Sequence, residues 1–155
     1  RVLERPTGHA DGGDVLVRPD KVLIGLSART DRTGAQALAG LLEQLGYRAE
    51  VAATPKEVLH LKTASSLLDE ETVLSTRALA ATGIFAGYRV IEVPEGEEGA
   101  ANVLRVNDRV IAGAGHPGVL EALDKHGLNV VALPNSAIAA IDAGFTCMSL
   151  RWRAA

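Results

Sequence analysis

Three residue types that together could perform nucleophilic catalysis lie far apart in the chain. The only cysteine is Cys147, in Ala-Gly-Phe-Thr-Cys-Met-Ser, while His60 lies in Leu-His-Leu-Lys and Asp11 begins Asp-Gly-Gly-Asp-Val-Leu. A nucleophilic cysteine needs a base or a cation that favours the thiolate, and the base needs an acid that orients it. Each residue stands at the start of an apolar, strand-like run. The pattern therefore suggests a Cys-His-Asp catalytic set, provided that the fold brings the three together.

Each of these residues also has an ordinary structural explanation. A single cysteine is more often a small buried hydrophobe, and a single histidine is often a core residue with satisfied ring nitrogens. Asp11 and Asp14 flank Gly12 and Gly13. Aspartates in such positions commonly form turns by bonding nearby backbone groups, and we expect this of Asp14.

Composition limits the classes of function. The 155 residues suffice for one domain with a sizeable core, and 47% hydrophobic and 23% charged residues are ordinary for a globular protein. A net charge of −3 argues against a nucleic-acid partner. The four histidines and one cysteine lack the spacing of a zinc site, so we expect no metal. No apolar run reaches the roughly 18 residues of a membrane helix, so we expect no membrane partner.

The single cysteine and the first residue bear on the cellular compartment and on processing of the chain. One cysteine allows no disulfide within the chain, which suits a reducing compartment, and with no visible signal peptide we expect a cytoplasmic protein. The chain begins with Arg1 rather than methionine, so we expect a processed or truncated form.

A pattern of strand pair, helix and strand recurs along the chain. The first unit has a strand pair in 12–27, a helix in 33–46 and a strand in 47–54. The second has a strand pair in 59–79, a short helix in 81–87 and a strand in 88–94. The third has a strand pair in 102–115, a helix in 117–127 and a strand in 129–134, and residues 145–152 begin a fourth unit with one strand. Repeats of this length indicate units that stack in a line or close into a ring.

The repeat differs from a doubly wound nucleotide-binding fold, because each unit begins with a strand pair. We expect His60 and Cys147 on the first strand of their units, and Asp11 immediately before the first strand of its own. If the units are arranged radially, such positions converge near the axis. This is the physical reason for treating the three residues as one site.

Four motifs, in order, resemble those of the pentein superfamily of guanidino-modifying enzymes. They are ADGGDVL at 10–16, IGLSART at 24–30, LHLKT at 59–63 and FTCMS at 145–149, and AANVLRVN at 100–107 is similar in character. Within the superfamily the chain most resembles the dimethylarginine dimethylaminohydrolases. The resemblance implies a pentein-type α/β-propeller of five ββαβ modules. Residues 1–155 would form the C-terminal portion of that single domain, about three of five modules plus one strand.

The resemblance also implies roles for particular residues. Cys147 would be the nucleophile, His60 the general acid/base and Asp11 the acid that orients His60. Arg29 would bind the substrate carboxylate, although a solvated surface arginine is the alternative. Ile141 would lend its backbone carbonyl to the substrate.

The implied reaction converts an Nω-methylated arginine to citrulline and an alkylamine through a covalent thiouronium on the cysteine, without a cofactor. The implied partner is a small guanidine substrate. The missing N-terminal modules, from another chain or from an upstream segment, would complete the ring. A homodimer is a further alternative for the assembly. Deiminases and amidinotransferases of this superfamily typically carry His-x-Asp, whereas this chain has Lys62 two residues after His60. Lys62 therefore favours methylated arginine. The alternatives are an arginine or agmatine deiminase and a non-catalytic pentein binding scaffold.

Overall fold

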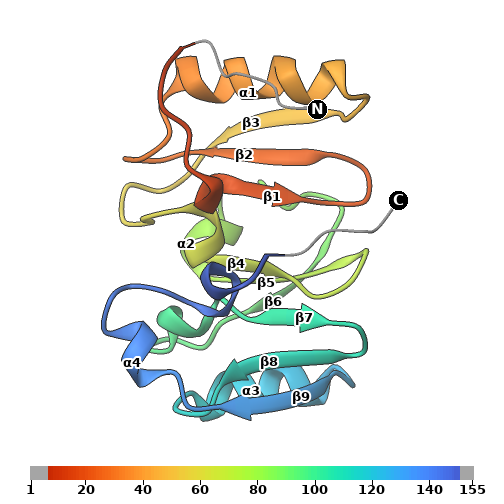
Figure 1. Cartoon of the computed structure of the whole chain (residues 1–155). Helices are drawn as coiled ribbons and strands as arrows, with labels where there is room; N and C mark the ends of the chain where they lie inside the picture. The colour runs from red at the N-terminus through yellow and green to blue at the C-terminus, as the bar shows by residue number, and fades with distance from the viewer. Residues whose placement is uncertain (1–6, 151–155) are drawn as a thin grey trace.

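Three successive stretches of the chain each fold into a strand hairpin, a helix and a third strand (Figure 1). The computed structural model describes residues 7–150. The first unit contains β1 (Val15–Val17), β2 (Val22–Leu26), α1 (Arg32–Gln44) and β3 (Ala49–Ala53). The second contains β4 (Ser65–Leu67), β5 (Thr72–Ser75), α2 (Arg77–Ala80) and β6 (Arg89–Glu92). The third contains β7 (Leu104–Val106), β8 (Arg109–Gly113), α3 (Pro117–Lys125) and β9 (Asn129–Leu133).

Every unit forms its own three-stranded mixed sheet. In each sheet the first two strands pair antiparallel, and the third strand pairs parallel to the middle one after a helical crossover. A parallel neighbour requires such a crossover, whereas an antiparallel neighbour needs only a short turn. The three sheets follow one another from top to bottom of Figure 1. The expected ββαβ repeat is confirmed, and the protein is an α/β fold with mixed sheets.

Local sequence explains where the two longer helices begin and end. Asp31 caps α1, because its carboxylate accepts a hydrogen bond from the Gly34 backbone N–H. The chain leaves α1 through Gly46, at a φ of +85°, which glycine adopts without strain. Pro117 occupies the first turn of α3, and Gly127 follows its end at a φ of +73°. Both predicted helix ends at glycine are confirmed.

The helix of the second unit differs from the prediction. The sequence predicts this helix within 81–87. In the structure α2 is only one turn long and lies before that range, where the Thr76 hydroxyl caps it. Residues 81–87 form turns instead. Gly83 and Gly87 have φ angles of +76° and +86°, which do not occur in a right-handed helix. The apolar residues in this segment, Ile84 and Phe85, are buried without helical periodicity.

The predicted first strand of a fourth unit is wrong for its described part. After β9 the chain forms α4 (Ser136–Ala139) and then a 3₁₀ turn, η4 (Phe145–Met148). Two backbone donors that a strand would use have other partners. Cys147 N–H bonds the nearby Gly144 carbonyl at 3.1 Å, and Thr146 N–H bonds the distant Asn102 Oδ1 at 3.0 Å. The last two residues of that predicted strand, 151 and 152, lie outside the described residues.

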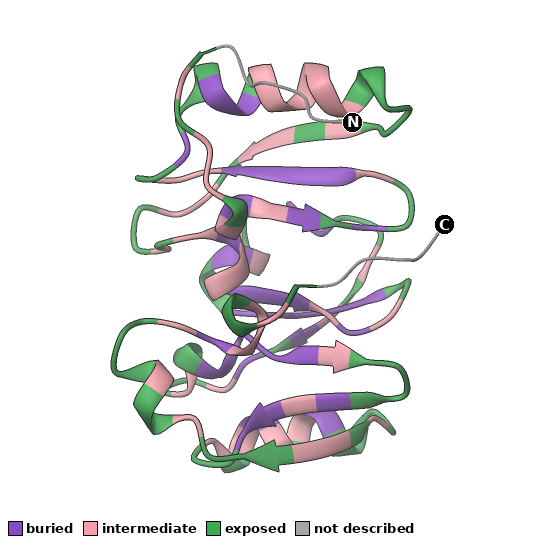
Figure 2. Ribbon diagram, in the orientation of Figure 1, coloured by how far each residue is buried: buried purple, intermediate pink, exposed green. Residues whose placement is uncertain are grey.

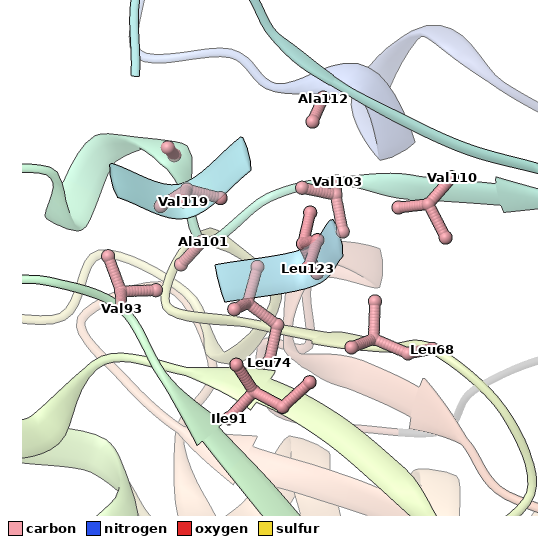
Figure 3. Packing of buried hydrophobic residues seen from close by; sticks show 11 residues of the cluster. Leu68, Leu74, Ile91, Val93, Ala101, Val103, Val110, Ala112, Val119 and Leu123 are labelled. Atoms are coloured by element: carbon pink, nitrogen blue, oxygen red, sulfur yellow. The ribbon is translucent and has the colours of Figure 1, made fainter. Parts of the chain in front are cut away.

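Two buried clusters cross from one unit to the next. Burial in Figure 2 is concentrated on the inner strands, whereas the last strands of the first and third units are largely exposed or half-buried. One cluster joins β1 and β2 to the second unit through Leu16, Leu23, Leu61, Val73 and Leu79. The other joins the second and third units (Figure 3), through Leu68, Leu74, Ile91, Val103, Val110, Val119 and Leu123 among others. Neighbouring units therefore share cores and stabilise each other.

None of the described helices combines the length and apolar character that crossing a membrane would take.

Candidate active site

Asp11 lies at the start of a tight turn that precedes the first sheet. Residues Gly12–Asp14 form a 3₁₀ turn, η1, and Asp11 caps it by accepting a hydrogen bond from Gly13 N–H at 2.7 Å. The sequence predicts Asp11 immediately before a strand. This prediction is wrong, because the η1 turn lies between Asp11 and β1. The turn leaves the Asp11 side chain 43% exposed, with one carboxylate oxygen aimed at the second unit.

His60 also precedes a 3₁₀ turn rather than lying on a strand. It adopts an extended backbone before η2 (Leu61–Thr63). The Thr63 hydroxyl holds it there by accepting from His60 N–H at 3.1 Å and donating to the His60 carbonyl at 2.7 Å. Its imidazole lies against Gly13, where a Cβ atom would come within 2.7 Å of the ring. The absence of a side chain at Gly13 thus makes room for the ring.

Asp11 and His60 are brought together. His60 Nε2 is 3.5 Å from Asp11 Oδ1, and the His60 side chain is only 16% exposed. The two atoms are within ion-pair distance, but Nε2 is buried without a hydrogen-bond partner among residues 7–150. A small rotation of either side chain would make the bond, and apo sites often have such loose contacts.

Cys147 lies on η4 and is exposed. Its Sγ is 3.8 Å from Nδ2 of Asn102, a buried residue just before β7. Gly144 packs so closely on Asn102 that any side chain at 144 would overlap the amide. None of the hydrogen bonds and ion pairs described for residues 7–150 joins Cys147 to His60 or Asp11. The thiol therefore lies beside Asn102, which sequence reasoning did not single out.

Arg29 and Ile141 are both on the surface. Arg29 is exposed and lies between Ser27 and Thr30, with its backbone N–H bonded to the Ser27 hydroxyl at 3.0 Å. Ile141 is 75% exposed and follows α4. The next residue, Asp142, has a φ of +55°, an uncommon backbone conformation outside glycine. None of the described backbone hydrogen bonds of residues 7–150 uses the Ile141 carbonyl oxygen.

An open pocket of about 880 Å³ adjoins the residues that support His60 and Cys147. Thr63, Asn102 and Gly144 line it, but His60 and Cys147 themselves do not. Its charged lining is mainly acidic: Glu57, Glu95, Glu98 and Asp142 against Arg77. Arg77 also forms an exposed ion pair with Glu92, with Nε 3.2 Å from a carboxylate oxygen. Hydrogen bonds from the backbone N–H of Glu98 and of Gly96 hold the pKa of Glu98 below its ordinary value, which keeps it ionised.

The interpretation of Asp14 as a local turn residue was wrong. Its side chain is fully buried, and its carboxylate bonds groups from distant parts of the chain, including Leu61 N–H at 2.9 Å. An Asp beside two glycines is a common turn signal, so nothing in the sequence distinguished this residue. Across residues 7–150 the structure gathers no three His, Cys, Asp or Glu side chains that could hold a metal ion.

Two bacterial enzymes named N(G),N(G)-dimethylarginine dimethylaminohydrolase are similar to the chain in sequence. The chain is 37% identical over 150 residues to N(G),N(G)-dimethylarginine dimethylaminohydrolase of Pseudomonas aeruginosa, with 97% of this chain and 58% of that protein covered. It is 35% identical over 147 residues to the enzyme of the same name from Streptomyces coelicolor, with 94% of this chain and 55% of that protein covered. The chain thus spans little more than half the length of these relatives.

Solved structures agree in fold. A cysteine-to-serine variant of the Pseudomonas aeruginosa enzyme, complexed with citrulline, superposes with a TM-score of 0.89 at 36% identity, covering 97% of this chain and 58% of that one. An amidinotransferase from Microseira wollei shares the fold, with a TM-score of 0.82 at 20% identity, covering 94% of this chain and 48% of that one. The family model described as arginine deiminase matches residues 2–96. With more than half of its length matched in this way, the chain belongs to the arginine deiminase family.

Proposed function

We propose that the complete protein is a hydrolase that converts Nω-methylated arginine to citrulline and an alkylamine. The observation that carries the proposal is the contact between Asp11 and His60, 3.5 Å apart. It occurs in a chain 37% identical to a dimethylarginine dimethylaminohydrolase. A half-buried histidine beside a carboxylate is suited to act as a general acid and then as a general base.

The proposed reaction proceeds in two steps. A guanidinium carbon is a poor electrophile, so a strong nucleophile is needed, and the Cys147 thiolate supplies it. The sulfur forms a bond to that carbon, and the His60 imidazolium protonates the departing alkylamine, leaving a thiouronium on Cys147. His60, now neutral, takes a proton from water as the water attacks the same carbon. The sulfur then leaves as a thiolate, and citrulline is released. No cofactor enters this scheme.

The remaining residues of the proposed site hold the substrate. Arg29 binds the substrate carboxylate, and its exposed position next to the Asp11 turn leaves the guanidinium group accessible. The Ile141 carbonyl accepts a hydrogen bond from a substrate N–H. The carboxylates of the 880 Å³ pocket attract a cationic substrate towards this part of the surface.

The architecture of the complete protein is also a proposal. We infer a pentein-type α/β-propeller in which the described units form about three of five modules. The other modules come from an upstream segment or from another chain. The coverage of 58% of the Pseudomonas aeruginosa relative supports this reading, since about two-fifths of that protein has no counterpart here. A homodimer of the complete protein stays open, and the lone cysteine suits a cytoplasmic location.

Citrulline release from the complete protein tests the function. With dimethylarginine as substrate, Cys147→Ser and His60→Ala should abolish turnover while the far-ultraviolet circular dichroism spectrum is unchanged. His126→Ala is the matched control, because His126 is an exposed histidine after α3 whose ring bonds only the Ala122 carbonyl in the described structure. Turnover near the wild-type rate in the Cys147 or His60 variant would reject the mechanism.

A deiminase that acts on unmodified arginine or on agmatine is the second candidate. The family model described as arginine deiminase favours it, as does 28% identity over 155 residues to the arginine deiminase of Mycobacterium avium. Lys62 opposes it, because a lysine repels the guanidinium where an aspartate would bind it. Comparing kcat/KM for arginine, agmatine and dimethylarginine decides between them. A non-catalytic scaffold is the outcome if none of the three is turned over.

A further inference from the structure

Asp14 is the most deeply buried carboxylate near the proposed site, with a fully buried side chain. One oxygen, Oδ1, accepts a hydrogen bond from Leu61 N–H at 2.9 Å. The other, Oδ2, accepts from the Ser27 hydroxyl at 2.7 Å and from the Thr30 hydroxyl at 2.6 Å. We call Asp14, Ser27, Thr30 and the Leu61 amide the Asp14 cluster. Its bonds span 13, 16 and 47 residues of sequence, so it is not a local turn.

Each arm of the Asp14 cluster ends at the backbone of a proposed site residue or of its neighbour. The Thr30 hydroxyl accepts from Asp11 N–H at 3.0 Å while it donates to Asp14. The Ser27 hydroxyl accepts from Arg29 N–H at 3.0 Å while it donates to Asp14. The third arm bonds the amide directly after His60. The backbone segments that carry Asp11, Arg29 and His60 are thus all linked by hydrogen bonds to one carboxylate.

The Asp14 carboxylate meets all three donors through its two oxygens. It accepts through both oxygens and donates nothing, whereas an amide of the same shape replaces one acceptor by a donor. None of the ion pairs described for residues 7–150 includes Asp14. Burying a polar group without partners is costly, so the three donors supply the stabilisation that water otherwise gives.

We propose that Asp14 is the positioning residue of the site: it sets the relative placement of the orienting acid, the carboxylate-binding arginine and the catalytic histidine. This inference rests on the proposed function. The carboxylate does not touch substrate, and it acts through two hydroxyls and one amide. The two hydroxyl arms serve different steps. The Thr30 arm controls Asp11 and thereby the proton transfer by His60, and the Ser27 arm controls Arg29 and thereby substrate binding.

The test separates the two arms in the complete protein with dimethylarginine as substrate. Thr30→Val should lower kcat by about tenfold with KM nearly unchanged, and Ser27→Ala should raise KM by about tenfold with kcat nearly unchanged. Asp14→Asn should do both. Ser75→Ala is the control, because Ser75 is equally buried but its hydroxyl bonds only the neighbouring Thr76 carbonyl in the described structure. A merely structural cluster would give no such division, and parallel losses in all three variants would overturn the proposal.

Amide hydrogen exchange, measured residue by residue by NMR, gives a readout that does not need turnover. Asp14→Asn should speed exchange at residues 11, 29 and 61 together, Thr30→Val at 11 alone and Ser27→Ala at 29 alone. If Asp14→Asn fails to fold, the two single-arm variants decide. Wild-type protein without activity rejects the proposed function, while unchanged exchange at these amides rejects the Asp14 cluster whether or not the protein is active.

Discussion

Asn102 and Cys147 meet across 45 residues of sequence, with Nδ2 of the amide 3.8 Å from Sγ. The same side chain holds the turn that carries the cysteine, since Oδ1 accepts from Thr146 N–H at 3.0 Å. One amide therefore fixes the backbone of the segment and offers a donor to the sulfur. A donor at this position stabilises a thiolate more than a thiol, because hydrogen bonds to charged groups are the stronger ones.

Replacing Asn102 by Asp should separate these two tasks. The carboxylate still accepts from Thr146 N–H, but it presents a negative charge in place of the donor, and like charges disfavour a thiolate. Alkylation of the sole cysteine by iodoacetamide at pH 7 should slow by about tenfold or more, measured by mass spectrometry. Asn107→Asp adds the same charge in the exposed turn between β7 and β8 and should leave the rate unchanged. Equal rates in Asn102→Asp and wild type would contradict a role for Asn102.

A methyl group at Gly13 should displace the ring of His60. The new Cβ would come within 2.7 Å of the His60 ring, so the ring must move away from its place beside Asp11. A misplacement of about 1 Å can cost about 100-fold in rate, and we expect a loss in kcat of that order for Gly13→Ala. Gly12→Ala is a matched control, because nothing lies within 4 Å of a Cβ there. If the two variants turn over dimethylarginine equally, the ring position is not limiting.

The cap of α1 should make stability depend on pH in the acid range. Hydrogen bonds from Gly34 N–H and then His9 N–H hold the pKa of Asp31 below its ordinary value of about 3.8. A carboxyl with a depressed pKa in the folded state stabilises the fold above its unfolded pKa, and this contribution is lost as the pH falls through the folded pKa. Asp31→Asn should therefore lower the Tm at pH 7 and match wild type near pH 2. A Tm difference that stays constant across that range would exclude the linkage.

The core shared by the second and third units should be sensitive to truncation. Leu123 on α3 is fully buried against residues of β5, β6 and β8. Leu123→Ala should lower the free energy of unfolding by about 2–5 kcal/mol, from lost burial and the cavity left behind. Leu45→Ala, at a leucine that is 49% exposed, should cost far less. Urea unfolding at neutral pH measures both, and equal losses would show that the core does not couple the two units.

The repeat and its two long helices could be predicted from sequence, because apolar spacing and the stops at Gly46 and Gly127 have direct local causes. The position of α2 could not, since the left-handed backbone at Gly83 and Gly87 leaves no trace in hydrophobicity. Nor could the turn at Cys147, because the Asn102 side chain, 44 residues earlier in the sequence, accepts the hydrogen bond of the Thr146 N–H.

The site follows the same division. Asp11 and His60 were recognisable by residue type and motif, and the structure brings them within 3.5 Å. Asp14 and Asn102 act through long-range hydrogen bonds, which residue type and local spacing do not reveal. Whether the named residues perform the proposed chemistry stays a prediction for the variants described above.

The three sheets of the described chain are not continuous with one another, so the seams between units are held by side chains. The Ser66 hydroxyl on β4 accepts from Val103 N–H at 2.9 Å and donates to the Ala101 carbonyl at 2.8 Å. The Arg18 guanidinium lies 3.7 Å from the centre of the Tyr88 ring, joining the first unit to the second. A single substitution at a seam can therefore tilt one unit against the next without breaking a strand ladder. Successive small tilts can change the relative positions of site residues on different units, and so change which substrates fit, without a change of fold.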